Sequence, residues 1–245
     1  MVNLVLEFWP ELLNGFIVTC EVVGLSIILG SPLALILALL RVHGGALIRH
    51  SASLYCFALR GTPLLAQLFL IYYGAGQFRP SLEALGLWQF FRSPFTCTVF
   101  AFALNTAAYQ VEILYGALQS IAPGQEEAAR MLGLGPAARL LHVRLPQALI
   151  VALRPLGNEY VIVMKASALA SVVTVYDLMG ETRQIFAKTF DIGIYVIAAL
   201  IYLVIVELFR RFWSLIEQRM TRHIGNVSVS AVRDVRMVSG TARAV

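Results

Sequence analysis

Long apolar runs alternate with short charged segments along most of the chain. Five of these runs are near the length that an α-helix needs to cross a hydrocarbon core of about 30 Å. They are Val22–Leu40, Gly61–Phe78, Ser93–Val111, Leu145–Tyr176 and Ile192–Val206. The strands of a β-barrel would instead alternate apolar and polar residues over about ten positions. The pattern therefore predicts an all-α membrane protein with five transmembrane helices.

Composition and charge agree with this pattern. Of the 245 residues, 59% are hydrophobic and only 13% are charged, whereas an ordinary globular domain carries roughly 25% charged residues. Cytoplasmic segments of membrane proteins are rich in Lys and Arg. With the N-terminus outside and the C-terminus inside, thirteen of the 19 basic residues fall in inside segments and four in outside segments. The sequence predicts this orientation, with Arg60 either at the inner interface or partly embedded.

The net charge of +5 follows from these inner arginines, and no patch of basic and aromatic residues suggests a nucleic-acid groove. Basic inner segments favour anionic headgroups, so we expect membrane lipid as a partner and no nucleic acid. Cys20, Cys56 and Cys97 lie in or beside apolar runs without pair spacing. We expect them to pack as small polarizable residues and to take no part in a metal site or a disulfide.

Three polar residues recur at intervals of seven in the third span: Thr98, Asn105 and Glu112. This spacing places them on one face of a helix, and ionisable residues inside a membrane usually face a bundle interior or a wet cavity. Two interpretations remain open. The three side chains form a polar stripe along a transport path, or they are structural, with Asn105 bonding a neighbouring helix and Glu112 capping the inner end of its own.

The fourth span contains Pro155, which we expect to break the helix near Leu156 and Gly157, just before Asn158 and Glu159. Broken helices at mid-membrane depth are tolerated where they line a cavity. A carboxylate in such a cavity could receive the amino or guanidinium group of a cationic substrate. The alternative is that Glu159 pairs internally with a basic residue, either Arg60, Arg154 or Lys165.

One charged segment, Glu126–Gln147, is helix-prone and twice interrupted by glycine. Acidic residues in the first turn favour a helix over Gln125–Leu132, and Gly133 ends it. Pro136 suits the first position of a second helix, Ala137–Val143, which Leu145 and Pro146 are expected to end. The sequence thus predicts a helix–turn–helix between two spans, which is either an amphipathic connector or a docking element.

The spacing within this segment resembles the EAA loop of ABC-type importer permeases. The segment reads Glu127-Ala128-Ala129, three residues, Gly133, nine residues, then Val143, one residue, and Leu145-Pro146; the family has isoleucine where this chain has Val143. The resemblance implies that the loop, residues 119–146, holds a cytoplasmic coupling helix between spans three and four that docks on a separate ATPase. Its coupling residues would be Glu127, Ala128, Ala129, Gly133, Leu145 and Pro146.

Other stretches resemble polar amino acid importers, notably RGTPLLAQLFLIYYG at Arg60–Gly74 and GNEYVIVMKASAL at Gly157–Leu169. Within that family the chain is most similar to the M-type permease subunits of the histidine/lysine-arginine-ornithine and octopine/nopaline importers. The resemblance implies a type I ABC importer permease fold in the bacterial inner membrane and a polar, basic amino acid or an opine as substrate. We place Thr62, Asn105, Glu112, Asn158 and Glu159 on the expected substrate path.

The same resemblance implies partners and a domain organisation. The partners would be a cytoplasmic ABC ATPase dimer, a second, homologous permease subunit in a heterodimer, and a periplasmic amino-acid-binding protein. The chain would consist of a periplasmic N-terminal segment (1–14) and a transmembrane domain (15–219). Residues after Arg222 mix Ser, Val, Gly and Arg without a helical period, so we expect a mobile cytoplasmic tail (220–245).

The sequence contains no motif for binding ATP. A phosphate-binding loop would read G-x-x-x-x-G-K-[ST], and neither lysine, Lys165 or Lys188, follows that glycine pattern. We therefore expect no cofactor and no enzymatic activity here, with ATP bound by the partner ATPase. The alternative function is an ion-coupled secondary amino acid carrier that acts without an ATPase; such carriers usually show more helices or an inverted repeat, and we find neither in the sequence.

Overall fold

The computed structural model describes residues 6–222, and residues 1–5 and 223–245 lie outside that description. The predicted tail at 220–245 is therefore outside it from residue 223 on. All regular elements in the described range are helical. The α-helices are α2 (Trp9–His43), α3 (Ala46–Gly61), α4 (Leu64–Gln77), α5 (Arg79–Ala84), α6 (Trp88–Phe91), α7 (Pro94–Gln119), α8 (Pro123–Met131), α9 (Pro136–Arg139), α10 (Leu145–Ala166), α11 (Leu178–Thr189) and α12 (Gly193–Thr221).

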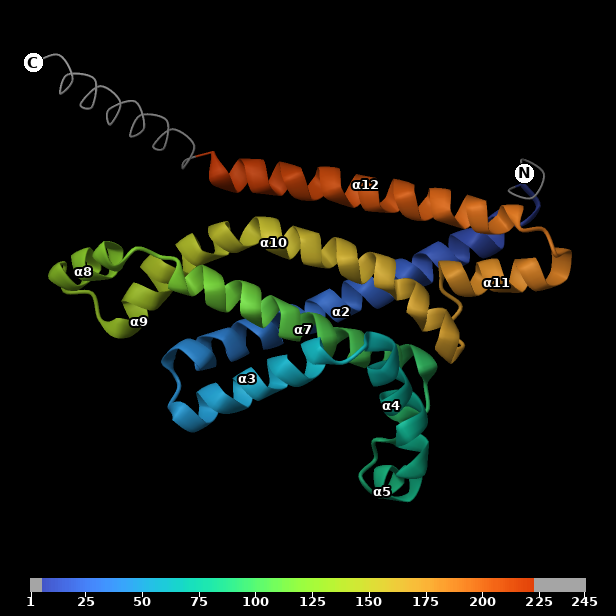
Figure 1. Ribbon diagram of the computed structural model, residues 1–245, viewed down its shortest axis with the longest axis horizontal. Coiled ribbons are helices and arrows are strands. Elements are labelled where there is room, and N and C mark those ends of the chain that lie inside the picture. Colours follow the sequence, from blue (N-terminus) through green and yellow to red (C-terminus); the bar gives the residue numbers. More distant parts are fainter. Residues whose placement is uncertain (1–5, 223–245) are drawn as a thin grey trace, which may run out of the picture.

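Four long helices, α2, α7, α10 and α12, run along the longest axis of the molecule (Figure 1). Helices α8 and α9 lie at one end of this bundle, here called the α8 end, and α11 lies at the opposite α11 end. Four helical stretches within residues 6–222 are long and apolar enough to cross a membrane, and the pair α3 and α4 makes a fifth if it is taken as one bent span. The predicted helical class is confirmed, with four to five candidate spans.

The second span differs from the straight helix predicted over Gly61–Phe78. Helix α3 ends at Gly61, Thr62 and Pro63 are extended, and α4 leaves at a bend of 100°. Pro63 explains the break, because a proline disfavours the helical conformation in the residue before it and lacks the N–H that would continue the helix. The apolar residues before Gly61 therefore form a separate helix, and α4 turns away from the long axis (Figure 1).

The helix break predicted at Pro155 is wrong, because α10 continues through this residue. Neighbouring helices often satisfy the backbone groups that a proline frees in a membrane helix. The carbonyl that Pro155 leaves without its helical donor is that of Val151, four residues before it; close by, the Nε1–H of Trp213 on α12 donates to the carbonyl oxygen of Leu153 at 2.8 Å and ties the two helices together. Leu145 and Pro146 do not end a helix either: α9, the π-helical turn Leu140–Arg144 and α10 follow one another without a gap, since proline is tolerated in the first turn of α10.

Small residues set the closest helix contacts. Gly30 of α2 faces α7 so closely that a Cβ there would lie 2.9 Å from the carbonyl oxygen of Ala103. A Cβ on Gly157 of α10 would lie 2.2 Å from the indole of Trp213 on α12. Membrane helices gain little from hydrophobic burial against each other and associate through such close backbone approaches. The position of α10, and of the polar residues that it carries, therefore depends on Gly157.

Asp177 fixes the start of α11 at the α11 end. Its Oδ1 accepts from the N–H of Gly180 at 2.9 Å, as an N-cap does, and the hydroxyl of Tyr202 on α12 donates to Oδ2 at 3.2 Å. The N–H of Leu178 donates to Oγ1 of Thr19 on α2 at 3.1 Å. Burial raises the pKa of Asp177 to about 6, although these hydrogen bonds oppose the shift.

Candidate functional site

The segment at residues 123–146, here called the α8–α9 segment, contains the bend that the sequence predicts at Gly133. The φ of Gly133 is +76°, its N–H donates to the carbonyl of Arg130 at 2.9 Å, and the N–H of Leu134 donates to that of Ala129 at 3.1 Å. These bonds form a Schellman motif, with glycine at the left-handed position. The motif satisfies two of the free carbonyls at the end of α8 and turns the chain toward α9.

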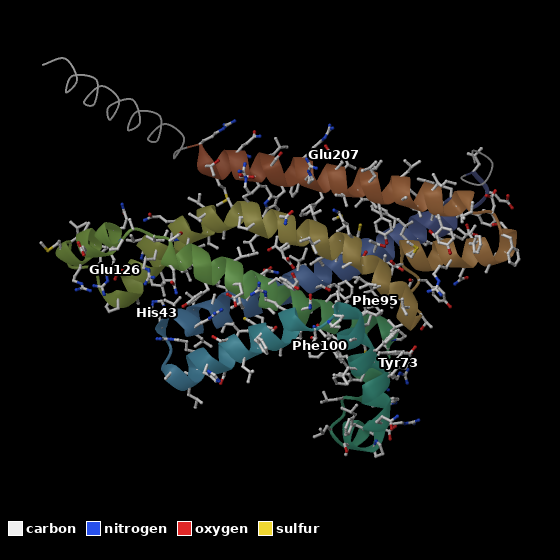
Figure 2. The ribbon with its side chains drawn as sticks, in the orientation of Figure 1. His43, Tyr73, Phe95, Phe100, Glu126 and Glu207 are labelled. Carbon is white, nitrogen blue, oxygen red and sulfur yellow. The ribbon has the colours of Figure 1, made fainter. Side chains whose placement is uncertain are left out.

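Polar contacts tie the α8–α9 segment to itself and to the spans. Arg139 Nε lies 2.8 Å from Glu126 Oε1, and these two residues line a small cavity with His43 at the end of α2. Figure 2 shows Glu126 and His43 at this same end of the molecule. The guanidinium of Arg144 donates to the carbonyl of Leu118 on α7 at 3.3 Å. The segment is therefore bonded to α7 and continuous with α10.

The predicted coupling residues differ in accessibility. Glu127, Ala128, Gly133 and Pro146 are exposed, Leu145 is half-buried, and Ala129 is buried inside the segment. At the tip, Met131 and Leu132 are 90% and 80% exposed. Two neighbouring apolar side chains on a charged loop form a small surface suited to contact with another protein.

One amide side chain holds the bend between α3 and α4. The Nε2 of Gln67 donates to the carbonyl of Leu59 at 2.7 Å and to the carbonyl and hydroxyl oxygens of Thr62 at 3.1 and 2.8 Å. The Nδ2 of Asn105 on α7 donates to the same Leu59 carbonyl and to Oε1 of Gln67, both at 3.1 Å. Gln67 and Asn105 thus satisfy carbonyl groups that the broken helix leaves free.

A cavity of about 540 Å³, here called the bend cavity, lies beside this bend. Its walls come from α3, α4, α7 and α10 and are mostly apolar. Its polar lining residues are Arg60, Thr62, Asn105, Tyr109 and Glu159. Three residues of the predicted substrate path, Thr62, Asn105 and Glu159, therefore meet in one cavity although they are far apart in the sequence. Asn105 combines the two roles that the sequence left open, because it bonds a neighbouring helix and also lines the cavity.

Glu159 is the buried carboxylate of the bend cavity. It is 6% exposed, and the hydroxyl of Thr106 donates to its Oε1 at 3.3 Å. Within residues 6–222 no basic side chain lies within 4.0 Å of it: Arg60 pairs with Glu112 and Arg154 with Glu217. The internal ion pair considered from the sequence is thus not formed.

Glu112 contrasts with Glu159 because it has two cationic partners. Its Oε1 lies 2.7 Å from Arg41 Nη1 and 3.4 Å from Arg60 Nη1. The guanidinium carbon of Arg41 also lies 4.2 Å from the centroid of the Tyr115 ring. Because α7 runs on to Gln119, Glu112 does not cap the helix; it joins α2, α3 and α7.

Two other polar residues considered from the sequence lie outside the bend cavity. Asn158 is exposed on the outer face of α10, so it does not share the environment of Glu159. The hydroxyl of Thr98 donates to the carbonyl of Pro94 in its own helix at 2.8 Å. The interval of seven correctly places Thr98, Asn105 and Glu112 on one helix, but only Asn105 reaches the bend cavity.

Comparison with known proteins identifies the family. The profile of the family described as "Binding-protein-dependent transport system inner membrane component" matches residues 30–222. The chain belongs to this family. It is an inner-membrane permease, and its place in a binding-protein-dependent ABC system implies an ATPase and a binding protein as partners. The permease is not itself an enzyme. A permease of a binding-protein-dependent ABC system belongs to a different class of transporter from the ion-coupled carrier considered as the alternative function.

Three relatives from different organisms are similar to this chain over most of their length. The nopaline transport system permease protein of Agrobacterium fabrum is 36% identical over 91% of this chain and 93% of its own length. The L-cystine transport system permease protein of Bacillus subtilis is 37% identical, with coverage of 89% and 90%. The histidine/lysine/arginine/ornithine transport system permease protein of Escherichia coli is 36% identical, with coverage of 91% and 98%.

One solved structure is similar in both sequence and fold. A crystal structure of an amino acid ABC transporter with histidines aligns with a TM-score of 0.78 at 36% identity, covering 88% of this chain and 96% of that one. Together with the relatives, this likeness shows that the chain is a permease of an ABC amino acid importer.

Sequence reasoning missed several polar residues in or beside the bend cavity of this permease: Tyr109 lines it, Gln67 holds the bend next to it, and Thr106 bonds Glu159. Gln67 carried a usable signal, since an amide inside an apolar run of a membrane span needs an internal partner. Tyr109 and Thr106 carried none, because tyrosine and threonine are ordinary residues in membrane helices. The pairing of Arg41 with Glu112 joins two different spans, and no local pattern indicates it.

Proposed function

We propose that this permease translocates a polar, cationic amino acid or an opine, and that the bend cavity is part of its path. The observation that carries this proposal is Glu159, a buried carboxylate without a cationic partner among the described residues. An unpaired carboxylate in a membrane costs several kcal/mol unless it is hydrated or paired. A substrate amino or guanidinium group supplies that pairing. The relatives named for histidine, lysine, arginine and ornithine support a basic side chain, whereas the cystine relative supports only an amino acid.

Glu159→Gln tests this substrate class, because it keeps the size of the side chain and removes its charge. The variant should assemble with its partners, and uptake of arginine- or histidine-like substrates should fall at least about tenfold relative to neutral amino acids. Asn158→Ala, which changes the neighbouring exposed position without adding a charge, serves as the control. A stable Glu159→Gln complex with unchanged uptake of every cationic substrate would remove Glu159 from the path.

We infer that the α8–α9 segment is the coupling element that docks on the separate ATPase, which binds the ATP. The exposed Glu127, Ala128, Met131 and Leu132 would form the contact, and the bonds to α7 and α10 would carry the movement into the membrane. Lys165 and Lys188, without a phosphate-binding loop around either, support an ATP site on another polypeptide. Co-purification of the ATPase with wild-type and segment variants tests this assignment.

We propose an orientation with the N-terminus in the periplasm and the α8 end in the cytoplasm. The distribution of basic residues supports it, as does the position of the coupling element at the α8 end. A reporter fused after Arg222 should be cytoplasmic and one inserted at Ser81 should be periplasmic. A cytoplasmic reporter at Ser81 would show that the spans are miscounted.

We further propose that the second permease subunit of the complex is a homologous but different chain. The similarity to the nopaline and histidine/lysine/arginine/ornithine permeases supports a heterodimer with an ATPase dimer and a periplasmic amino-acid-binding protein. Co-expression of two differently tagged copies of this chain tests it. A functional complex that contains both tags, and no other permease, would mean a homodimer.

A further inference from the structure

Arg60 belongs both to the bend cavity and to an ion-pair cluster. It lies in the last turn of α3, its side chain is 41% exposed, and it lines the bend cavity with Glu159. Its Nη1 lies 3.4 Å from Glu112 Oε1, and its guanidinium carbon lies 5.2 Å from the centroid of the Tyr109 ring. The guanidinium therefore stands between an acid outside the cavity and the space inside it.

Glu112 holds Arg60 only loosely, because the same oxygen atom already has a closer partner. Arg41 approaches Oε1 of Glu112 to 2.7 Å and is 16% exposed, less than half the exposure of Arg60. One carboxylate neutralises one guanidinium, so the cluster of Arg41, Glu112 and Arg60 has a surplus of one positive charge. That surplus lies on Arg60, the more distant and more exposed of the two arginines.

Among the residues that the structure describes, the bend cavity therefore contains one cation with a weak partner, Arg60, and one anion without a cationic partner, Glu159. An α-amino acid carries the matching pair of charges, and a basic one carries a second cation in its side chain. If a cationic group of the substrate pairs with Glu159, its α-carboxylate still needs a counter-charge, since an unpaired buried anion is costly. A guanidinium is suited to this role because it binds a carboxylate through two parallel N–H donors.

We propose that Arg60 binds the α-carboxylate of the transported amino acid and exchanges its contact with Glu112 for this one. The proposal rests on the substrate class assigned above and adds a second binding residue to the same cavity. Arg41 stays with Glu112, so this acid does not become an unpaired charge when Arg60 moves. Arg60 then selects for the part of the substrate that all α-amino acids share, whereas Glu159 selects for the cationic group.

Decarboxylated and neutral analogues separate the two residues. The complex with its ATPase and second permease is reconstituted in lipid nanodiscs, and binding of labelled L-arginine is measured without the periplasmic binding protein. Competition uses agmatine, which lacks the carboxylate, and L-citrulline, which keeps the carboxylate but has a neutral side chain. L-histidine and histamine form a second pair.

Wild type should prefer L-arginine over agmatine by about tenfold to a hundredfold, the range expected for a hydrogen bond to a charged group. Arg60→Gln should reduce this ratio to about one and leave the preference of arginine over citrulline in place. Glu159→Gln should reduce the preference of arginine over citrulline and leave the preference of arginine over agmatine in place. Arg60→Lys, which keeps the charge but not the two parallel donors, should retain part of the ratio; it also serves as the test if the glutamine variant does not assemble. Arg79→Gln removes an exposed arginine that pairs with Glu83 and should change neither ratio.

An unchanged arginine-to-agmatine ratio in Arg60→Gln and Arg60→Lys overturns the proposal. If that result is accompanied by the expected loss in Glu159→Gln, the substrate class survives and only the role of Arg60 fails. If wild type binds neither L-arginine nor L-histidine, both the substrate class and the role of Arg60 are wrong.

Discussion

The α8–α9 segment and the bend cavity carry the two halves of the proposed function, and they are built in opposite ways. The segment is held by bonds between residues close in sequence, such as those of Gly133 with Arg130 and Leu134 with Ala129. The polar residues of the cavity come from α3, the link after it, α7 and α10. A surface that must fit a partner is encoded in one short stretch, whereas a cavity that must enclose a substrate requires several helices to meet.

The two regions also treat charge differently. The α8–α9 segment pairs Glu126 with Arg139 internally and presents Glu127 and apolar residues at its surface. Within residues 6–222, Glu159 of the bend cavity has no cationic partner, while Glu112 nearby has two. The α8–α9 segment thus has an internal ion pair, whereas the buried acid of the bend cavity has no cationic partner among the described residues.

The largest expected effect is in the α8–α9 segment. Glu127→Lys reverses an exposed charge in the proposed ATPase contact, so uptake should fall to background, about a hundredfold, while the permease still inserts into the membrane. The measurement is uptake together with co-purification of the ATPase. Glu83→Lys, a charge reversal at an exposed position on α5, should retain the ATPase. Normal uptake and normal ATPase yield in Glu127→Lys would show that Glu127 plays no part in coupling.

The next effect is in the bend. Gln67→Leu keeps the approximate size but removes the amide that satisfies the carbonyls of Leu59 and Thr62, and each buried group left unsatisfied costs about 1–3 kcal/mol. The melting temperature of the complex and the uptake rate should both fall. Gln77→Leu, at the exposed end of the same helix, is the matched control and should leave both unchanged. Equal melting temperatures for the two variants would mean that the amide does not hold the bend.

A smaller effect is expected at the turn of the α8–α9 segment, where two glycines differ in backbone conformation but not in the space around them. A Cβ would meet no atom within 4 Å at either Gly133 or Gly135, but only Gly133 has a positive φ, of +76°. Gly133→Ala should therefore destabilise the turn by about 1 kcal/mol, and Gly135→Ala should not. Faster amide hydrogen exchange across residues 123–134 in the first variant alone is the expected result. Similar exchange in both variants would show that the turn tolerates alanine.

The smallest effect concerns pH at the α11 end. Burial raises the pKa of Asp177 to about 6 from 3.8, so the folded protein binds this proton more tightly than the unfolded chain. The proton on Asp177 therefore stabilises the folded protein. This contribution to the free energy of unfolding is fully present at pH values below about 4 and is lost as the pH rises through about 6. Asp177→Asn keeps an N-cap and removes the titration, so its melting temperature should vary less between pH 4 and 7 than that of wild type. Parallel curves for the two proteins would contradict the assignment.

Much of the fold could be predicted from sequence, because membrane spans and turns are local features. The apolar runs predicted α2, α7, α10 and α12, and Gly133 predicted the turn after α8. The prolines could not be interpreted from the local sequence alone. The break predicted at Pro155 is wrong, because α10 continues through this residue. The break at Pro63 was not predicted; there, Gln67 and Asn105 satisfy the carbonyl of Leu59, which lies four residues before the proline and receives no N–H from it.

The candidate site was predicted in part. Thr62, Asn105 and Glu159 were singled out because polar groups in membrane spans are costly, and they do line one cavity. Asn158 was included because it is adjacent to Glu159 in sequence, yet successive residues of a helix point in different directions and it lies on the outer face. The partner of Arg60 was not found from the sequence, which suggested only Glu159 as its acid, whereas the structure pairs Arg60 with Glu112 of another span.

By itself, the sequence determined that the chain is helical, that it crosses the membrane, and that it carries an exposed helix–turn–helix whose spacing resembles the EAA loop of the family. These features depend on hydrophobic length and on the backbone preferences of residues such as Gly133 and Pro136, which act over a few positions. Only the tertiary structure decided where the second span bends, which polar residues share a cavity, and which buried acid lacks a cation. The reason is that charge neutralisation and hydrogen-bond satisfaction depend on atoms within about 4 Å, and those atoms belong to helices far apart in the chain.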